Sequence, residues 1–293
     1  MQTAGFKLDE SRVAGLSPDM RYAEAAKLVA EQAPLRIVPG ERMAGSATLL
    51  EAVRHQTPVA GVGSTSHTTI GFHKVLPRGY HDLRQRIGAR RARGGLDAQG
   101  LDLLHAMELC LDAAAIWHRR HLELLDRRIA DGTGAEQDNY RRVRQALANV
   151  PENPPTTFHE AVQSLWFMFE FQRLMGNWSG VGRLDEMLGP YLEMDLAAGR
   201  ITLDEAREIL AHFWIHGTEW AGLQYGSGDA QHYQNVILSG MDSGGRDVTN
   251  EVTYLVLDII EELVISDFPV AVRMSSRSSE KLFRRVAEAQ RRG

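Results

Sequence analysis

The sequence predicts one large α/β domain that is predominantly helical, with its strands concentrated in the last quarter. Helical periodicity and helix start signals dominate the first two thirds of the 293 residues. From residue 234 onward the pattern changes to strand, helix, strand and helix. A composition of 43% apolar residues provides ample material for a packed core.

Composition excludes several classes of protein. The 33 basic and 38 acidic residues form no one-sided basic surface of the kind that binds nucleic acid. The arginine clusters at residues 84–93 and 141–144 alternate with helix formers, and we interpret them as solvated helix faces. No apolar run approaches the roughly 18 residues of a membrane span, and the first residues lack a secretion signal. The single cysteine, Cys110, fits a reducing compartment, so we expect a cytoplasmic protein.

The first helix has a clear start. Ser17 is followed by Pro18 at the first helical position, and the helix is expected to run to about residue 31, before Pro34. Residues 40–80 are rich in glycine, serine and threonine with little periodicity. We therefore expect a long ordered loop that ends in a short helix near Tyr80.

Two long helices follow. The first is predicted over residues 102–125, and the second over residues 136–150, where Pro151, Pro154 and Pro155 stop it. Cys110 lies within the first of these helices and is expected to behave as a small buried apolar residue.

Two further helix starts match the capping box, in which a threonine oxygen and a glutamate carboxylate bind otherwise unpaired backbone amides. The two pairs are Thr157 with Glu160, and Thr202 with Glu205. The helix after Thr157 is apolar nearly all the way round, which predicts a central helix covered on several sides.

The helix after Thr202 has two faces. Its apolar face contains Ala206, Ile209, Leu210, Phe213 and Trp214. Its polar face is expected to contain Glu205, Glu208, His212 and His216. His212 and His216 are four residues apart, but one helix rarely provides a complete set of metal ligands and no His-Glu-x-x-His motif accompanies them. His118 and His121 lie beside two arginines, so we predict no metal site at either pair.

The last quarter predicts a parallel crossover unit. QNVILSG and FPVAVRM read as strands, and between them Asn250 opens a helix. The apolar stripe of that helix is Leu255, Val256, Ile259, Ile260, Leu263 and Val264. Two strands are too few to bury both faces of a parallel sheet. We therefore expect a sheet whose remaining strands are absent from residues 1–293. This helix and both strands should then have uncovered apolar surface.

Several segments resemble the glycyl radical enzyme family, the pyruvate formate-lyase-like proteins, in the same order along the chain. They are PLRIVPGERMAGSATL, SHTTIGFHKVLPRGYHDL, AMELCLDAAAIWHRR, TTFHEAVQSLWF, GRLDEMLGPYLEMDLAAGRITLDEAREIL and YQNVILSGMDSGGRDVTNEVTYLVLD. The resemblance covers about residue 21 to the end. It implies a barrel of two half-barrels of parallel strands wrapped in helices, with a sealed radical site. Residues 1–293 would form the N-terminal part of that domain, with its first strands only.

The resemblance also implies where the chemistry lies. The family's radical cysteine comes after the strand equivalent to FPVAVRM, and its radical glycine lies near the far C-terminus. We therefore expect no catalytic residue and no bound cofactor within residues 1–293, which alone would be inactive, and a glycyl radical in the missing C-terminal part. The implied partners are a small substrate, a radical S-adenosylmethionine activating enzyme and, at full length, a second copy of the chain.

The candidate substrate contacts in this portion are His67, Asn177 and Trp178. His67 corresponds to a histidine near the substrate in dehydratase-type relatives, although a structural histidine bonded within the loop is the alternative. Diol dehydratases have Gly-His-Ser where this chain has Gly176, Asn177 and Trp178. The imidazole is replaced by an amide and the hydroxyl by a large ring, which argues against a diol dehydratase.

Two polar residues of the GRLD segment, Arg183 and Asp185, fit a structural ion pair as well as a ligand contact, and we favour the structural role. For the reaction, the resemblance leaves carbon-carbon cleavage and dehydration or a related elimination open. The alternative function is a non-catalytic α/β module that binds a small molecule or a partner chain.

Overall fold

The computed structural model describes residues 8–45, 66–175, 177–217, 234–265 and 268–292; for Ser66, His67 and Trp178 the description covers the backbone only. The helices are α1 (Glu10–Val13), α2 (Pro18–Gln32), α4 (Phe72–Val75), α5 (Gly79–Ala92), α6 (Ala98–Asp131), α7 (Gly134–Asn149), α8 (Phe158–Leu174), α9 (Leu184–Ala197), α10 (Leu203–Gly217), α11 (Glu251–Leu263) and α12 (Glu280–Gln290). The strands are β1 (Ser66–Thr69), β2 (Trp178–Gly180), β3 (Gly182–Arg183), β4 (Val236–Leu238) and β5 (Val270–Val272).

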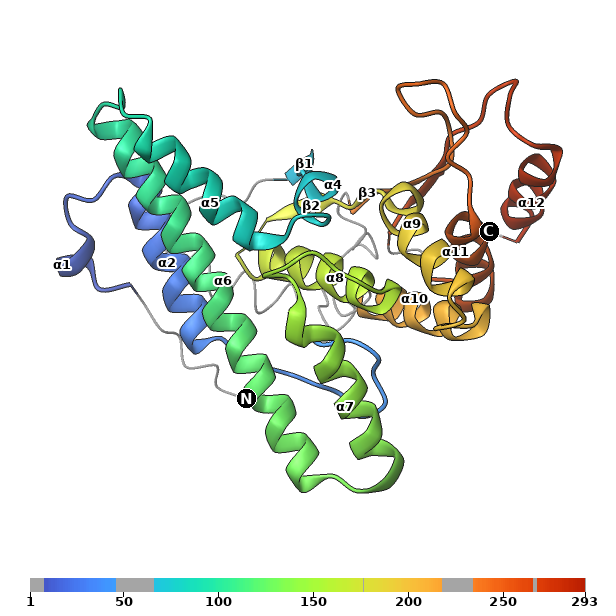
Figure 1. Cartoon of the computed structure of the whole chain (residues 1–293), viewed down its shortest axis with the longest axis horizontal. Helices are drawn as coiled ribbons and strands as arrows, with labels where there is room; N and C mark the ends of the chain where they lie inside the picture. The colour runs from blue at the N-terminus through green and yellow to red at the C-terminus, as the bar shows by residue number, and fades with distance from the viewer. Residues whose placement is uncertain (1–7, 46–65, 176, 218–233, 266–267, 293) are drawn as a thin grey trace, which may run out of the picture.

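The N-terminal half is a layer of long helices in which α2 lies along α6, with α5 and α7 also against α6 (Figure 1). The predicted start of α2 is confirmed, because Ser17 Oγ accepts a hydrogen bond from the Met20 amide at 3.2 Å. At the other end of α2, the Arg120 guanidinium of α6 donates to the carbonyls of Ala30 and Ala33. The start of α2 is thus fixed by its own capping residue, and its end is fixed by hydrogen bonds from α6.

Residues 40–80 are more regular than the sequence predicts. The described part of this region contains β1 and α4, and α5 begins at Gly79 as a helix of 14 residues rather than a short one. The start of α5 is anchored because the amides of Tyr80 and His81 donate to the carbonyls of Pro151 and Glu152, both at 2.9 Å. Gly79 has a φ of +75°, and a Cβ there would lie 2.5 Å from the Glu152 carbonyl, so this junction requires glycine.

Helix α8 is central, as predicted. Every residue from 161 to 171 is buried, and α7, α9, α10 and β2 surround the helix. The capping prediction is correct for Thr157, whose Oγ1 accepts from the Glu160 amide, but the Glu160 carboxylate binds the amide of Thr156 instead of Thr157. At α10 the box is complete, with Thr202 and Glu205 bonded in both directions.

A strap of residues 41–45 crosses α7, α8 and α10, and consecutive residues are held by different helices. Asn139 of α7 binds the Glu41 carbonyl, and Arg42 forms an ion pair with Glu208 of α10 at 2.8 Å. On α8, His159 donates to the Arg42 carbonyl and the Trp166 indole donates to the Gly45 carbonyl. The backbone N–H and C=O of Ala44 both bond the side-chain amide of Gln163, each at 2.8 Å.

The five apolar residues predicted for one face of α10 are all buried, but the prediction for His216 is wrong. His216 is 1% exposed: its ring lies 5.1 Å from that of Trp166, and its Nε2 lies 3.5 Å from Glu41. The last turn of α10 is covered on a second side by α8 and the strap. The solvent-exposed face of the helix therefore ends before His216.

The described strands form two parallel sheets, one of two strands and one of three. β1 pairs with β2, and β3, β4 and β5 pair in that order, all in parallel. β2 and β3 belong to one extended segment interrupted at Val181, where the amides of Val181 and Gly182 both donate to the Asn235 carbonyl. Asn250 caps α11 with a complete capping box, and α11 provides the predicted crossover between β4 and β5.

The expectation of broad uncovered surface is wrong for α11 and β4. Leu255, Val256 and Ile259 are buried because α9, α10 and α12 pack against α11, and the β4 residues Val236 and Leu238 are fully buried. Within the described part of this crossover unit, uncovered apolar surface lies on β5, which is only partly buried, and at the end of α11, where Val264 is 78% exposed. Within the described residues, no helix has the length and apolar character needed to cross a membrane.

Candidate functional site

Two of the three predicted contact positions lie on neighbouring strands. His67 is on β1 and Trp178 is on β2, and the register pairs Ser66 with Trp178 and Thr69 with Gly180. The backbones of His67 and Trp178 are therefore close together, although the segments lie far apart in the sequence. Their side chains are outside the described structure, so a contact of either side chain with substrate stays a prediction.

Asn177 has well-defined partners. Its Nδ2 donates to the Tyr22 hydroxyl at 2.9 Å and lies 3.4 Å from Gln172 Oε1, while its backbone amide donates to the Gln172 carbonyl at 2.9 Å. Burial raises the pKa of Tyr22, so its hydroxyl stays protonated. Asn177 therefore ties the start of β2 to α2 and to the end of α8.

Asp185 has the structural role expected of it. Its fully buried carboxylate accepts hydrogen bonds from the Ser239 amide and the Thr253 hydroxyl, both at 2.6 Å, and from the Glu186 amide at 2.8 Å. Burial raises the pKa of Asp185, and these hydrogen bonds partly oppose that shift. Arg183 forms its ion pair with Glu186, at 2.9 Å, and donates to the Ser239 carbonyl. Asp185 thus joins α9, the end of β4 and α11.

The sequence reasoning missed a buried ion pair just before the candidate segment. Glu170 and Arg173 of α8 are in contact, and both side chains are at most 1% exposed. The Arg173 guanidinium also lies 5.9 Å from the Trp166 ring and 5.7 Å from the Phe169 ring. A buried charge pair needs good geometry to offset its desolvation, and such pairs are frequent near functional sites. The signal was present in the sequence as two opposite charges within an otherwise apolar helix.

Gln234, at the entry to β4, is a second polar residue that the sequence reasoning missed. Its side chain is 1% exposed, and in the described structure neither atom of its amide has a hydrogen-bond partner. The next residue, Asn235, binds the amides that follow β2. An unpaired buried amide is costly, so this position, two residues before the strand that pairs with β3, is a candidate for a polar contact.

The buried histidines of α6 have structural partners. His118 donates to the Leu147 carbonyl and His121 to the Trp117 carbonyl, while burial lowers the pKa of His159 and His212. Across the described ranges, no group of three or more His, Cys, Asp or Glu side chains is close enough to hold a metal ion.

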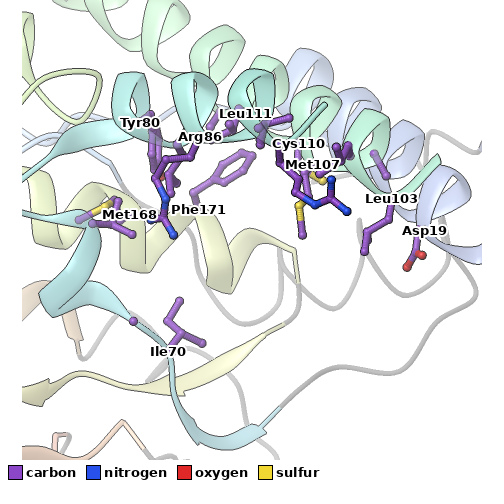
Figure 2. Close-up of a pocket in the computed structure, with 18 of the residues that line it drawn as sticks. Asp19, Ile70, Tyr80, Arg86, Leu103, Met107, Cys110, Leu111, Met168 and Phe171 are labelled. Atoms are coloured by element: carbon purple, nitrogen blue, oxygen red, sulfur yellow. The ribbon is translucent and has the colours of Figure 1, made fainter. Parts of the chain in front are cut away.

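A cleft of about 900 Å³ borders this region. Helices α2, α5, α6 and α8 provide its walls, and Ile70 and Gly71, which follow β1, also line it (Figure 2). Tyr22 and Gln172, the partners of Asn177, belong to the lining as well. Cys110 is half-buried in this cleft rather than fully buried, and burial raises the pKa of its thiol to about 11, as suits an apolar packing residue.

Comparisons with known proteins agree with this architecture. A model of the family described as pyruvate formate lyase-like matches residues 57–293. The chain belongs to this family, the glycyl radical enzymes. The isethionate sulfite-lyase of Nitratidesulfovibrio vulgaris is 34% identical over 237 residues, which are 74% of this chain and 28% of the relative. The trans-4-hydroxy-L-proline dehydratase of Clostridioides difficile is 28% identical over 242 residues, 78% of this chain and 30% of the relative.

Solved structures show the same fold. Hydroxyproline dehydratase from Clostridioides difficile superposes with a TM-score of 0.83 at 22% identity, over 97% of this chain and 46% of that one. The B12-independent glycerol dehydratase from Clostridium butyricum gives 0.83 at 17% identity with the same coverage. The chain spans about 28% of the length of the isethionate sulfite-lyases that it matches. Its described strands are the first strands of the barrel seen in the solved structures.

Proposed function

We propose that this chain forms the N-terminal, substrate-side part of a glycyl radical enzyme that eliminates a leaving group from a small polar substrate. Release of sulfite from a hydroxyalkanesulfonate is the favoured reaction. Four isethionate sulfite-lyases are 30 to 34% identical to the chain, and a sulfopropanediol dehydratase of Klebsiella oxytoca is another relative that acts on a sulfonate. The replacement of Gly-His-Ser by Gly176, Asn177 and Trp178 supports a reaction other than diol dehydration.

The observation that carries the proposal is the pairing of β1 with β2, which makes neighbours of His67 and Trp178. His67 would hydrogen-bond the substrate or exchange a proton with it, and Trp178 would limit the size of the substrate. Asn177 would position Trp178, because its amide is bonded to Tyr22 and Gln172. The radical itself would be supplied by the cysteine and glycine regions of a family-length protein.

The family assignment supports the partners that we propose, and the single cysteine supports the proposed compartment. A radical S-adenosylmethionine activating enzyme would generate the glycyl radical, and the family-length protein would be a homodimer in the cytoplasm. Incubated alone with such an activating enzyme and S-adenosylmethionine under anaerobic conditions, this chain should give no glycyl doublet in the electron paramagnetic resonance spectrum. A doublet would contradict the proposed division of roles.

A chimera tests the substrate site directly. Residues 57–293 replace the matching segment of the Nitratidesulfovibrio vulgaris isethionate sulfite-lyase, and the radical content is measured first as evidence of correct assembly. We expect sulfite release from isethionate, and a loss of about 10²- to 10⁴-fold in kcat/KM for His67→Ala. His212→Ala is the matched control, since His212 lies on the outer part of α10 and should leave the rate unchanged.

Trp178→Ser tests specificity separately. Removing the ring should enlarge the site and change which substrates are accepted more than it changes radical content. Full turnover by the His67→Ala chimera, or an equal loss in His212→Ala, would show that the site is placed wrongly. A chimera that carries the radical but dehydrates a diol instead would refute the sulfite-lyase assignment.

A further inference from the structure

The cleft between α5, α6 and α8 has an apolar wall that remains open. Leu103 and Met107 of α6 are 39% and 45% exposed, although both lie on the cleft side of the helix (Figure 2). Met168 and Phe171 of α8 continue this wall, and Leu111 closes its deeper part. A cavity of about 900 Å³ with a mostly apolar lining has the size of a small-molecule site.

The part of the cleft lining that α5 provides is cationic. Arg86, Arg90 and Arg93 share one face of α5 and its end, at a spacing of four and three residues, and all three line the cleft. The side chain of Arg86 is 66% exposed, and its carboxylate neighbour, Asp82, is 3.8 Å away. Arg90 donates a hydrogen bond to the Gly94 carbonyl. Because a carbonyl is neutral, this bond does not compensate the positive charge of Arg90.

The other arginines of α5 behave differently. Arg84 forms an ion pair with Asp112 of α6, and Arg91 forms one with Glu108 of α6, both at 2.6 Å. These two arginines therefore hold α5 against α6. The carboxylate that lines the cleft, Asp19, lies beyond Leu103, at the end opposite Arg86 (Figure 2). The row of Arg86, Arg90 and Arg93 thus adds a positive field to a cleft whose remaining lining is mostly apolar.

We propose that this cleft binds an amphipathic anion, such as a medium-chain carboxylate or sulfonate. The alkyl chain lies along Leu103, Met107 and Phe171, and the anionic head group binds the guanidinium row on α5. Charge-assisted hydrogen bonds from arginine suit a carboxylate or sulfonate head, and the apolar wall suits an alkyl chain. This site is additional to the substrate site proposed above and does not depend on it.

Cys110 provides a reporter for occupancy. It is the single cysteine of the chain and lines the deep part of the cleft beside Met107. An alkyl chain in the cleft should cover this thiol and slow its alkylation by iodoacetamide. Protection should follow the same concentration dependence as binding measured by calorimetry.

The test uses the whole chain with decanoate and decane-1-sulfonate, below the concentrations at which they form micelles. We expect saturable binding of one molecule per chain, with 1-decanol at least tenfold weaker and acetate without effect. The triple variant R86Q/R90Q/R93Q should weaken decanoate binding at least tenfold. As a control with the same change in net charge, R119Q/R127Q/R128Q removes three positive charges from exposed positions of α6 outside the cleft and should change the Kd by less than twofold. The ratio of decanoate to decane-1-sulfonate affinity identifies the preferred head group.

Three results would overturn the proposal. They are equal affinity for 1-decanol and decanoate, an equal loss of binding in the triple variant and in the control, and alkylation of Cys110 at the same rate with and without ligand. Circular dichroism establishes that each variant is folded. The comparison of decanoate with 1-decanol needs no variant, so the proposal can fail even if the triple variant does not fold.

Discussion

Helices α8 and α5 border the same cleft, yet their side chains are used in opposite ways. Residues 161–171 of α8 are all buried, and its polar groups are bonded within the core. In α5 only Gly79, Tyr80 and Ile87 are buried, and most of its arginines reach the surface. Substitutions in the core around α8 should therefore affect folding, whereas substitutions along the open cleft should affect binding and leave folding almost unchanged.

Gln163→Leu should have the largest effect on stability. It removes the two hydrogen bonds that the amide makes with the backbone of Ala44, and leaves a buried N–H and C=O unpaired. We expect the free energy of unfolding to fall by about 4 kcal/mol, measured by urea denaturation. A loss below about 1 kcal/mol would mean that the strap is not held through Gln163.

The burial of His121 in the core should make the free energy of unfolding depend on pH. Its ring is fully buried against Trp117 and Phe167, and burial lowers its pKa from 6.5 to about 4. Above pH 6.5 the ring is neutral in both states. As the pH falls from 6.5 to about 4, the unfolded chain binds a proton that the folded protein does not, and stability decreases.

The contribution of His121 should reach about 3 kcal/mol near pH 4. Other buried histidines and ion-paired carboxylates act in the same direction, so the comparison is made with His121→Phe. This variant should have a shallower dependence of unfolding free energy on pH than the parent. Parallel curves for the two proteins would show that the ring is hydrated or protonated in the folded state.

Thr202→Ala lies between the two extremes. It removes the complete capping box at the start of α10, where the side chains of Thr202 and Glu205 are exposed. We expect a loss of about 1 kcal/mol in thermal or urea unfolding. Glu205→Gln retains the bonding geometry with a neutral acceptor and should cost less.

Met107→Gln should have the smallest effect, although it changes an apolar side chain. Met107 is 45% exposed in the cleft, and we expect the unfolding free energy to change by less than about 0.5 kcal/mol. A large loss would remove the contrast between the cleft and α8, because it would show that Met107 is part of the core.

The elements predicted correctly from the sequence are those whose signals are local. Ser17, Thr157, Thr202 and Asn250 mark helix starts through hydrogen bonds made within the first turn, so their positions follow from a few adjacent residues. Strand β1 was missed because it is stabilised by pairing with β2, which lies far away in the sequence. The burial of His216 was missed for the same reason, since the covering groups come from α8 and the strap.

In the candidate site, too, contacts between segments that are distant in the sequence could not be predicted. The resemblance to the family suggested contact regions around His67 and around Asn177, but only the parallel pairing of their strands shows that the two regions adjoin. The bonds from Asn177 to Tyr22 and Gln172 depend on how α2 packs beside α8. Periodicity in either helix alone contains no information about that packing.

The strap of residues 41–45 has a consequence for how this family can vary in length. Glu41, Arg42, Ala44 and Gly45 are bonded to groups on three helices, so an inserted or deleted residue would put every later partner out of register. Evolutionary insertions and deletions should therefore fall outside the strap. The length of the chain between Glu41 and Gly45 is therefore fixed by its contacts with α7, α8 and α10.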